Sequence, residues 1–168
     1  LYILTTMITA KFRIEDYLAE YLRGKWGIID EDGKPTGIIS IPENIYLYHI
    51  LWGLMQTKRE NETKVKPNIE IVLPHCRKGD RKDPRYYNHI SLRGSLIFNS
   101  RLKKFFRADM HEFFDYMKHE EGMTYKEASF LFVAKYGIDS IDPDSLAKNY
   151  SRWKDNVRLN RKKAYSSR

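Results

Sequence analysis

The apolar positions in the first part of the chain change their period several times, which predicts strands alternating with helices. Residues 8–12 alternate between apolar and polar side chains, as a short strand does, and apolar side chains then recur at helical spacing over about 14–25. Two short apolar runs follow at 27–29 and 37–41, separated by a polar turn that contains Gly and Pro. This second pattern predicts a β-hairpin.

The middle of the chain is expected to add one helix and a second hairpin. The sequence Ser-Ile-Pro-Glu at 40–43 has the form of a capping box, so we expect a helix to begin there and to continue through the apolar run 45–55. Residues 68–73 and 86–92 have the composition of strands. They would form a hairpin whose long connection contains the basic segment 77–85.

From about residue 95 the apolar periodicity is helical throughout. One apolar stripe predicts a helix over about 99–119. Residues 124–127 form a second capping box, whose helix should end at Gly137, and Asp-Pro-Asp at 142–144 is typical of a third helix start. The last helix is expected to bury one apolar face, made of Leu146, Tyr150, Trp153 and Val157.

These elements predict an α+β protein with two parts. Residues 7–94 would form a small mixed α/β part with two β-hairpins, and residues 95–160 a three-helix bundle. Residues 161–168 would be a basic tail. Residues 1–6 lack the features of a signal peptide and are left out of the expected fold.

Composition excludes several classes of protein. The chain has 168 residues, of which 42% are hydrophobic and 14% aromatic, and this is enough for a packed core. No run approaches the roughly 18 apolar residues of a membrane-spanning helix, so we expect no membrane contact. Cys76 is the only cysteine, which excludes an internal disulfide and is typical of a reducing compartment. We therefore expect a cytoplasmic protein.

The positive charge is concentrated in three segments. Lys and Arg number 30 against 22 Asp and Glu, for a formal net charge of +8. Residues 77–85, 86–108 and 148–168 sum to +3, +5 and +7, and the rest of the chain is net acidic. This pattern is typical of a surface that faces a polyanion, although a solvated C-terminal helix is the plainer alternative.

The last two expected helices are the strongest candidate site. The apolar face would anchor the final helix, while Arg, Asn and Lys on its outer face offer the donors that bind guanine, adenine and phosphate. In this respect residues 124–158 resemble helix-turn-helix DNA-binding domains of the three-helix kind, with 146–153 similar to a recognition helix, although the connection 138–142 is longer than their usual turn. A plain helical bundle is the alternative. The expected nucleic-acid contacts are Lys148, Asn149, Ser151, Arg152, Lys154, Asn156, Arg158, Arg161 and Lys162.

The basic connection of the second hairpin is another candidate. A β-ribbon tip of this charge would follow a phosphate backbone, and Tyr86 and Tyr87 beside it would stack on the bases of a single strand. The alternative is a solvated loop whose charges prevent association of strand edges. Its cations are Arg77, Lys78, Arg81, Lys82 and Arg85.

Four more cations lie at the start of the first helix of the bundle. They are expected to pair with the acidic stretch 109–121, and contact with phosphate is the alternative. They are Arg101, Lys103, Lys104 and Arg107.

Catalysis has little support in the sequence. His111 and Asp115 lie one helical turn apart, but the second His of a zinc-protease motif is absent. His75, Cys76 and His89 lack a fourth ligand for a metal site. We therefore expect no catalytic residue, no metal and no cofactor, with a metal-dependent nuclease as the alternative.

The sequence thus predicts a non-enzymatic protein that binds duplex DNA with its last helix. It would regulate transcription or serve as an accessory factor in replication or in a mobile element, and its α+β part would position that helix or form a homodimer. One alternative is a binder of RNA or of single strands that uses residues 77–87. Another is an interaction module whose basic helix docks on an acidic protein.

Overall fold

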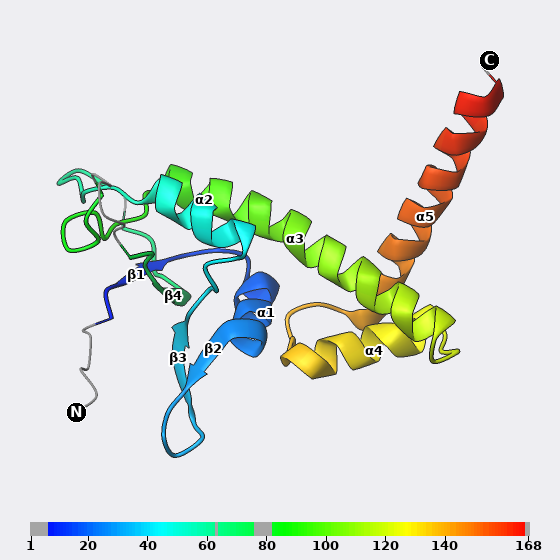
Figure 1. Ribbon diagram of the computed structural model, residues 1–168, viewed down its shortest axis with the longest axis horizontal. Helices are drawn as coiled ribbons and strands as arrows, with labels where there is room; N and C mark the ends of the chain where they lie inside the picture. Colours follow the sequence, from blue (N-terminus) through cyan, green and yellow to red (C-terminus); the bar gives the residue numbers. More distant parts are fainter. Residues whose placement is uncertain (1–6, 63, 76–81, 167–168) are drawn as a thin grey trace. The chain divides into compact units, whose positions relative to one another are not determined.

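The computed structural model describes residues 7–62, 64–75 and 82–166, which contain four strands and five helices (Figure 1). It confirms the α+β class. The chain divides into two compact units, Leu1–Phe106 and Arg107–Arg168, called unit 1 and unit 2 below. Helix α3, Leu92–His119, contributes residues to both units, so the division falls inside a helix and not near residue 95.

Unit 1 is built on a mixed sheet with the strand order β1-β4-β3-β2. Strand β4 pairs antiparallel with β1 and parallel with β3, with Ile71 opposite Ala10 and Ile39. Strands β2 and β3 form the expected first hairpin, and Gly33 takes a left-handed backbone conformation in its turn. The strands are β1 (Thr9–Phe12), β2 (Gly27–Ile29), β3 (Pro35–Ile39) and β4 (Ile69–Val72).

The core of unit 1 lies on one face of this sheet, because alternate side chains of a strand point to the same side. Phe12 of β1 is buried and meets Phe98 of α3 edge-on, with ring centroids 5.4 Å apart. Helix α1, Asp16–Trp26, adds Tyr21, which packs against Phe106 at 5.0 Å. Each such fully buried ring contributes roughly 1.5–3 kcal/mol to the free energy of folding.

The expected helix start at 40–43 is wrong. Helix α2 runs Tyr46–Leu54 and has no side-chain cap. The backbone N–H of Ser40 instead donates to Trp26 O, and Pro42 accepts from Ile45 N in a turn ahead of the helix. The capping box does not form, because this bond holds the Ser40 backbone beside the β2–β3 hairpin. Ser40 therefore cannot begin a helix.

The expected second hairpin is also wrong. Both edges of β4 are already paired, with β1 and with β3, so no edge is left for residues 86–92. Among the described residues of that segment, only His89 forms a bridge, and its partner is Gln56. Ser91 then begins α3, because its Oγ accepts from Gly94 N at 3.1 Å, and the helix starts seven residues earlier than expected, at Leu92.

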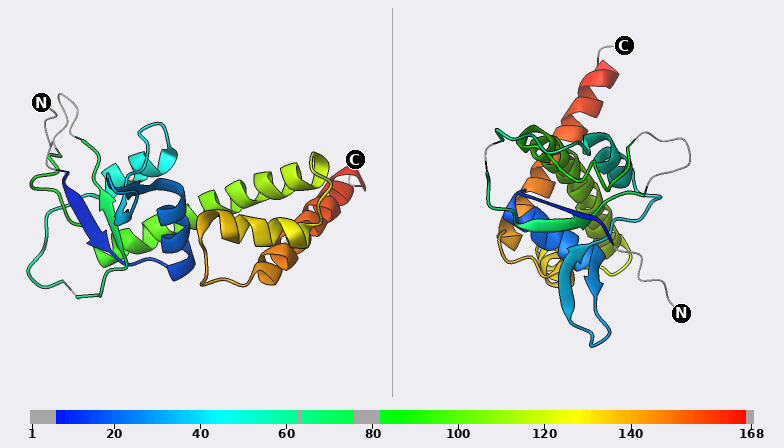
Figure 2. Two further views of the ribbon diagram at one scale, coloured as in Figure 1. Left: turned by 90° about the horizontal axis from the view of Figure 1, so that it is seen from below. Right: turned by 90° about the vertical axis from the view of Figure 1, so that its left-hand side faces the viewer.

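Unit 2 contains the end of α3 followed by α4 (Tyr125–Tyr136) and α5 (Pro143–Ser166), shown in Figure 2. The expected start and stop signals of α4 and the expected start of α5 are confirmed. Thr124 and Glu127 form the capping box, and Gly137 ends α4 in the left-handed conformation at φ 62°. The core of the unit is made of Phe114, Phe132, Leu146 and Tyr150.

The expected apolar face of α5 is buried only in its first turns. Leu146 and Tyr150 are buried, but Trp153 is 44% exposed and Val157 is half-buried. The helix also continues to Ser166, so most of the residues expected to be a tail extend it. Among the described residues, no helix combines the length and the apolar character that crossing a membrane requires.

Candidate nucleic-acid interface

The start of α5 is fixed by Asp142. Its carboxylate accepts from the backbone N–H and the hydroxyl of Ser145, at 3.1 and 2.9 Å, and Pro143 is the first helical residue. The Ser145 side chain, more than any other group, holds the pKa of Asp142 below its usual value. The carboxylate is therefore ionised near neutral pH, and it suits the positive end of the helix.

Tyr150 anchors α5 to the rest of unit 2. Only 1% of its surface is exposed, and its ring lies 5.4 Å from Phe114 and 4.9 Å from Tyr125. Its hydroxyl donates to Asp115 of α3. Burial raises the pKa of the Tyr150 phenol, and the Asp115 carboxylate raises it further, so the hydroxyl stays protonated and keeps this bond.

His111 and Trp153 extend this aromatic cluster toward the surface. Their rings lie 4.1 Å apart, and His111 is 5.1 Å from Tyr150. Partial burial lowers the pKa of His111, against the opposing effect of Asp115. His111 therefore serves as a neutral packing group.

Lys154 differs from the other expected contacts of α5. Its Nζ donates to the hydroxyl of Tyr125 and lies 4.8 Å from the centre of that ring. The side chain is half-buried, so its ammonium group interacts with the aromatic cluster of unit 2.

The other eight expected contacts of α5 are exposed. At 3.6 residues per turn, Lys148, Arg152 and Lys162 project within about 80° of one another, on the side of α5 opposite Leu146 and Tyr150. Neither Arg152 nor Arg158 forms an ion pair with any residue that the structure describes. The eight are Lys148, Asn149, Ser151, Arg152, Asn156, Arg158, Arg161 and Lys162.

The exposed surface of α5 is almost free of negative charge. Asp155 is the only carboxylate between Ser145 and Lys163, and it lies among the outward cations. The acidic groups Asp142 and Asp144 stand at the other end of the helix, where Asp144 pairs with Lys126 at 3.5 Å. The helix therefore has an acidic, capped start and a basic remainder.

The basic segment 77–85 does not form a ribbon tip in the part that is described. Arg77, Lys78 and Arg81 lie outside the described residues. Lys82 Nζ donates to the carbonyls of Trp52 and Gly53 at the end of α2, at 3.3 and 2.9 Å. The Trp52 carbonyl also accepts from Met55 N, so Lys82 adds a second donor to it and a charged donor to Gly53 O at the end of the helix.

Arg85 is exposed but paired within its own turn. Its Nη2 lies 2.6 Å from Asp83 Oδ2, and this side-chain bond is the main reason that the pKa of Asp83 is lowered. Tyr86 beside it is 68% exposed, with the Arg85 guanidinium 6.0 Å from its ring centre. Asp83 thus acts as a charge partner of Arg85.

The cations expected at the start of the first bundle helix lie 9–15 residues after the first residue of α3, and they do not pair as expected. Lys103 bonds Glu15 at 2.7 Å and not the acidic stretch 109–121. Partial burial acts to raise the pKa of Glu15, but hydrogen bonds from Lys103 and Asn99 keep it below its usual value. Arg101 and Lys104 are exposed and line a shallow depression together with Leu96. The apolar stripe predicted over about 99–119 did not indicate that Leu96 is exposed.

The histidines do not form a metal site. Among the described residues, no group of three or more His, Cys, Asp and Glu side chains is close enough to hold an ion, and Cys76 lies outside them. His89 bonds Glu62, a pairing across 27 residues that no sequence signal indicated.

Comparisons of the chain with protein-family models, with curated proteins and with solved structures found no match.

Proposed function

We propose that this protein binds duplex DNA with the exposed side of α5. The observation that supports this most directly is the row of outward cations on that helix. Arg152 and Arg158 are exposed and form no ion pair with a described residue, while Asp155 is the one carboxylate among them. A helix with these properties attracts a polyanion and keeps its donors available for it.

The way in which α5 is anchored also fits entry into the major groove. That groove is about 12 Å wide and admits one α-helix with its side chains. Leu146 and Tyr150 hold the first turns of α5, whereas all side chains between Arg158 and Lys163 are exposed. The later turns of α5 are therefore exposed on all sides, so that phosphates on both edges of a major groove would be able to contact them.

The residue types suggest separate roles along the helix. Arg152 would bind guanine through two hydrogen bonds, and Asn149 would bind adenine. Lys148, Arg158 and Lys162 would contact phosphates and so add affinity without sequence preference.

The proposal includes a biological setting that composition supports. A DNA-binding protein without catalytic groups would regulate transcription or act as an accessory factor in replication or in a mobile element. The single Cys76 agrees with a cytoplasmic location. Unit 1 would then position α5 or join two copies, because a two-fold dimer reads two half-sites.

Fluorescence anisotropy with labelled duplex DNA tests the proposal. Three phosphate contacts would give a slope of about −2.7 for log K against log salt concentration. Arg152→Ala should weaken binding to a selected site about 10- to 100-fold, since a good bidentate pair is worth roughly 1–3 kcal/mol of discrimination. Lys34→Ala, which removes one exposed cation from the β2–β3 turn of unit 1, serves as the control and should bind as the wild type does.

Competition experiments separate this proposal from its alternatives. Unlabelled duplex DNA should displace the probe better than single-stranded DNA, hairpin RNA or heparin does. Preference for RNA or for single strands would contradict the proposal, and displacement by heparin as strong as by duplex DNA would favour docking on an acidic protein.

A further inference from the structure

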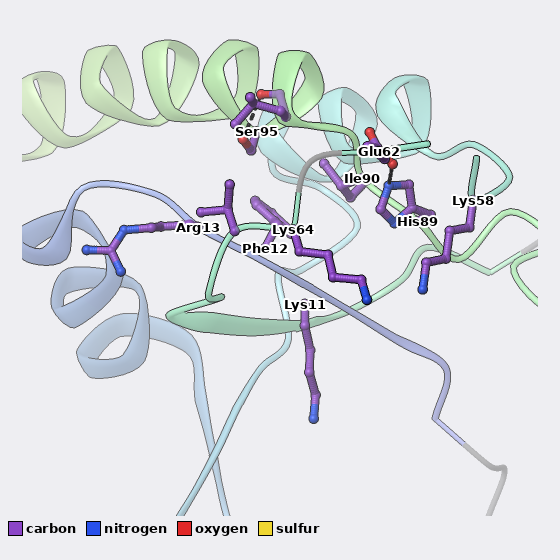
Figure 3. Close-up of a pocket in the computed structure, with 11 residues that line it drawn as sticks. Lys11, Phe12, Arg13, Lys58, Glu62, Lys64, His89, Ile90 and Ser95 are labelled. Atoms are coloured by element: carbon purple, nitrogen blue, oxygen red, sulfur yellow. Dashed lines mark hydrogen bonds and ion pairs between the residues drawn. The ribbon is translucent and has the colours of Figure 1, made fainter. Parts of the chain in front are cut away.

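A pocket in unit 1 has the character of an anion site. Its volume is about 240 Å³, and its lining comes from β1, from residues 58, 62, 64 and 65 and from the start of α3 (Figure 3). Phe12 and Ile90 form part of its lining and are buried, while four cations surround it. These are Lys11, Arg13, Lys58 and Lys64.

Two of the four cations are engaged elsewhere. Lys11 pairs with Glu70 at 3.4 Å, and Arg13 pairs with Asp16 at 3.5 Å. Figure 3 shows both side chains extending away from His89, so their charged groups lie at the rim of the pocket and contribute only to its general potential.

Lys58 and Lys64 are placed differently. Figure 3 shows both side chains running beside His89, with their ammonium groups on the same side of it. Neither forms an ion pair with any residue of the described ranges. Among the described residues of the lining, Glu62 is the only carboxylate, and His89 already bonds it. The positive charge of the two lysines is therefore not neutralised by an ion pair with any described residue.

The start of α3 strengthens this potential. Leu92 is the first residue of a 28-residue helix and lines the pocket together with Ser95. The positive end of the helix dipole thus lies at the pocket, where it favours an anion in the same way as the lysines do.

We propose that Lys58 and Lys64 bind the phosphate group of a small organic phosphate, with a mononucleotide as the ligand class. Lysine ammonium groups bind phosphate as point charges. Val65 and Leu92, both exposed and both in the lining, offer apolar contact for the rest of such a ligand. The pocket volume of about 240 Å³ is slightly below the roughly 300 Å³ at which small-molecule sites usually begin, so a mononucleotide suits it better than a larger cofactor does.

This site does not depend on the proposed DNA binding. Every residue that lines the pocket belongs to unit 1, and none belongs to α5. A mononucleotide bound here would therefore leave the α5 surface unchanged, and failure of either proposal would not affect the other.

Isothermal titration calorimetry of the full chain tests the site with three probes: adenosine 5′-monophosphate, adenosine and inorganic phosphate. The nucleotide should bind saturably in the millimolar range or tighter, and adenosine should not bind. Inorganic phosphate that binds as tightly as the nucleotide would support the phosphate site and identify free phosphate as its ligand. Adenosine that binds as tightly as the nucleotide would overturn the proposal.

Substitutions at the two lysines supply the second test. Lys58→Ala and Lys64→Ala should each weaken nucleotide binding about tenfold, and together about 100-fold, because each removes one charged partner of the phosphate. Lys34→Ala, the same change elsewhere in unit 1, should have no effect. Both lysines are exposed, so an unchanged melting temperature is expected to show that each variant is folded. Binding by the double variant that equals wild-type binding would overturn the proposal.

Discussion

Three cations of unit 1 and two of α5 are used in different ways. In unit 1, Lys82 donates to carbonyls at the end of α2, Arg85 pairs with Asp83, and Lys103 pairs with Glu15. On α5, Arg152 and Arg158 are exposed and have no such partner among the described residues. Equal charge in the sequence therefore corresponds to unequal availability in the structure.

This difference shows why net charge alone cannot locate a binding surface. A cation that already bonds a carboxylate or a carbonyl must break that bond before it can bind a ligand. Surface pairs are worth only about 0–1 kcal/mol each, but they also neutralise the local potential that attracts an anion. Arg152 and Arg158 form no such pair with a described residue, and apart from Asp155 the acidic residues of α5 lie at its start.

The largest expected effect comes from removing the anchor of α5. Tyr150→Ala should lower the free energy of unfolding by about 3–5 kcal/mol, since it leaves a cavity in the core of unit 2. Tyr116→Ala removes the same kind of ring where it is 53% exposed, and should change stability by less than about 0.5 kcal/mol. Denaturant unfolding monitored by circular dichroism measures both. Equal effects would contradict the assignment of Tyr150 as the anchor.

A smaller effect separates the two kinds of cation directly. Lys82→Ala should cost about 1 kcal/mol of stability, because Gly53 O loses its donor and Trp52 O keeps only the Met55 N–H. Arg158→Ala should cost less than about 0.5 kcal/mol, because nothing in the described fold depends on it. Thermal melting of the two variants checks this. A larger loss of stability in Arg158→Ala than in Lys82→Ala would contradict the distinction between the two kinds of cation.

The smallest expected effect is on the pH dependence of stability, through His111 beside the anchor Tyr150. The pKa of His111 is lowered in the folded state, chiefly by burial, so folding favours the neutral imidazole. The stabilisation is therefore complete above the pKa of the unfolded chain, about 6.5, and is lost as the pH falls below it. His111→Gln should make the stability between about pH 7 and about pH 5 flatter, measured by urea unfolding, whereas His119→Gln, at an exposed position, should not.

Helix ends in unit 2 could be predicted because their signals are local. Thr124, Asp142 and Gly137 act on backbone groups within three or four residues, so the sequence around each contains the whole interaction. The outward direction of Lys148 and Arg152 follows from the helical period alone. For the same reason, most residues of the candidate interface on α5 could be predicted from the sequence.

The errors arose where distant segments decide the outcome. The Ser40 cap fails because its backbone bonds Trp26, and the strand expected at 86–92 has no free edge of β4 to join. Lys82 and Lys103 find partners about 30 and 90 residues away, at the end of α2 and at Glu15. Such pairings depend on the assembled sheet and helices, which periodicity and local motifs do not specify.

The availability of the α5 cations can be tested by matched charge removal. One variant replaces Lys148, Arg152, Arg158 and Lys162 of α5 with Gln, and the other replaces Lys34, Arg59, Lys66 and Lys104 of unit 1, all of which are exposed. Both lose the same net charge, and duplex binding is measured by anisotropy at one salt concentration. We predict that the α5 variant loses binding while the unit 1 variant stays close to wild type. Equal loss in both variants would mean that DNA responds only to total charge, and would contradict the proposal that α5 is the contact surface.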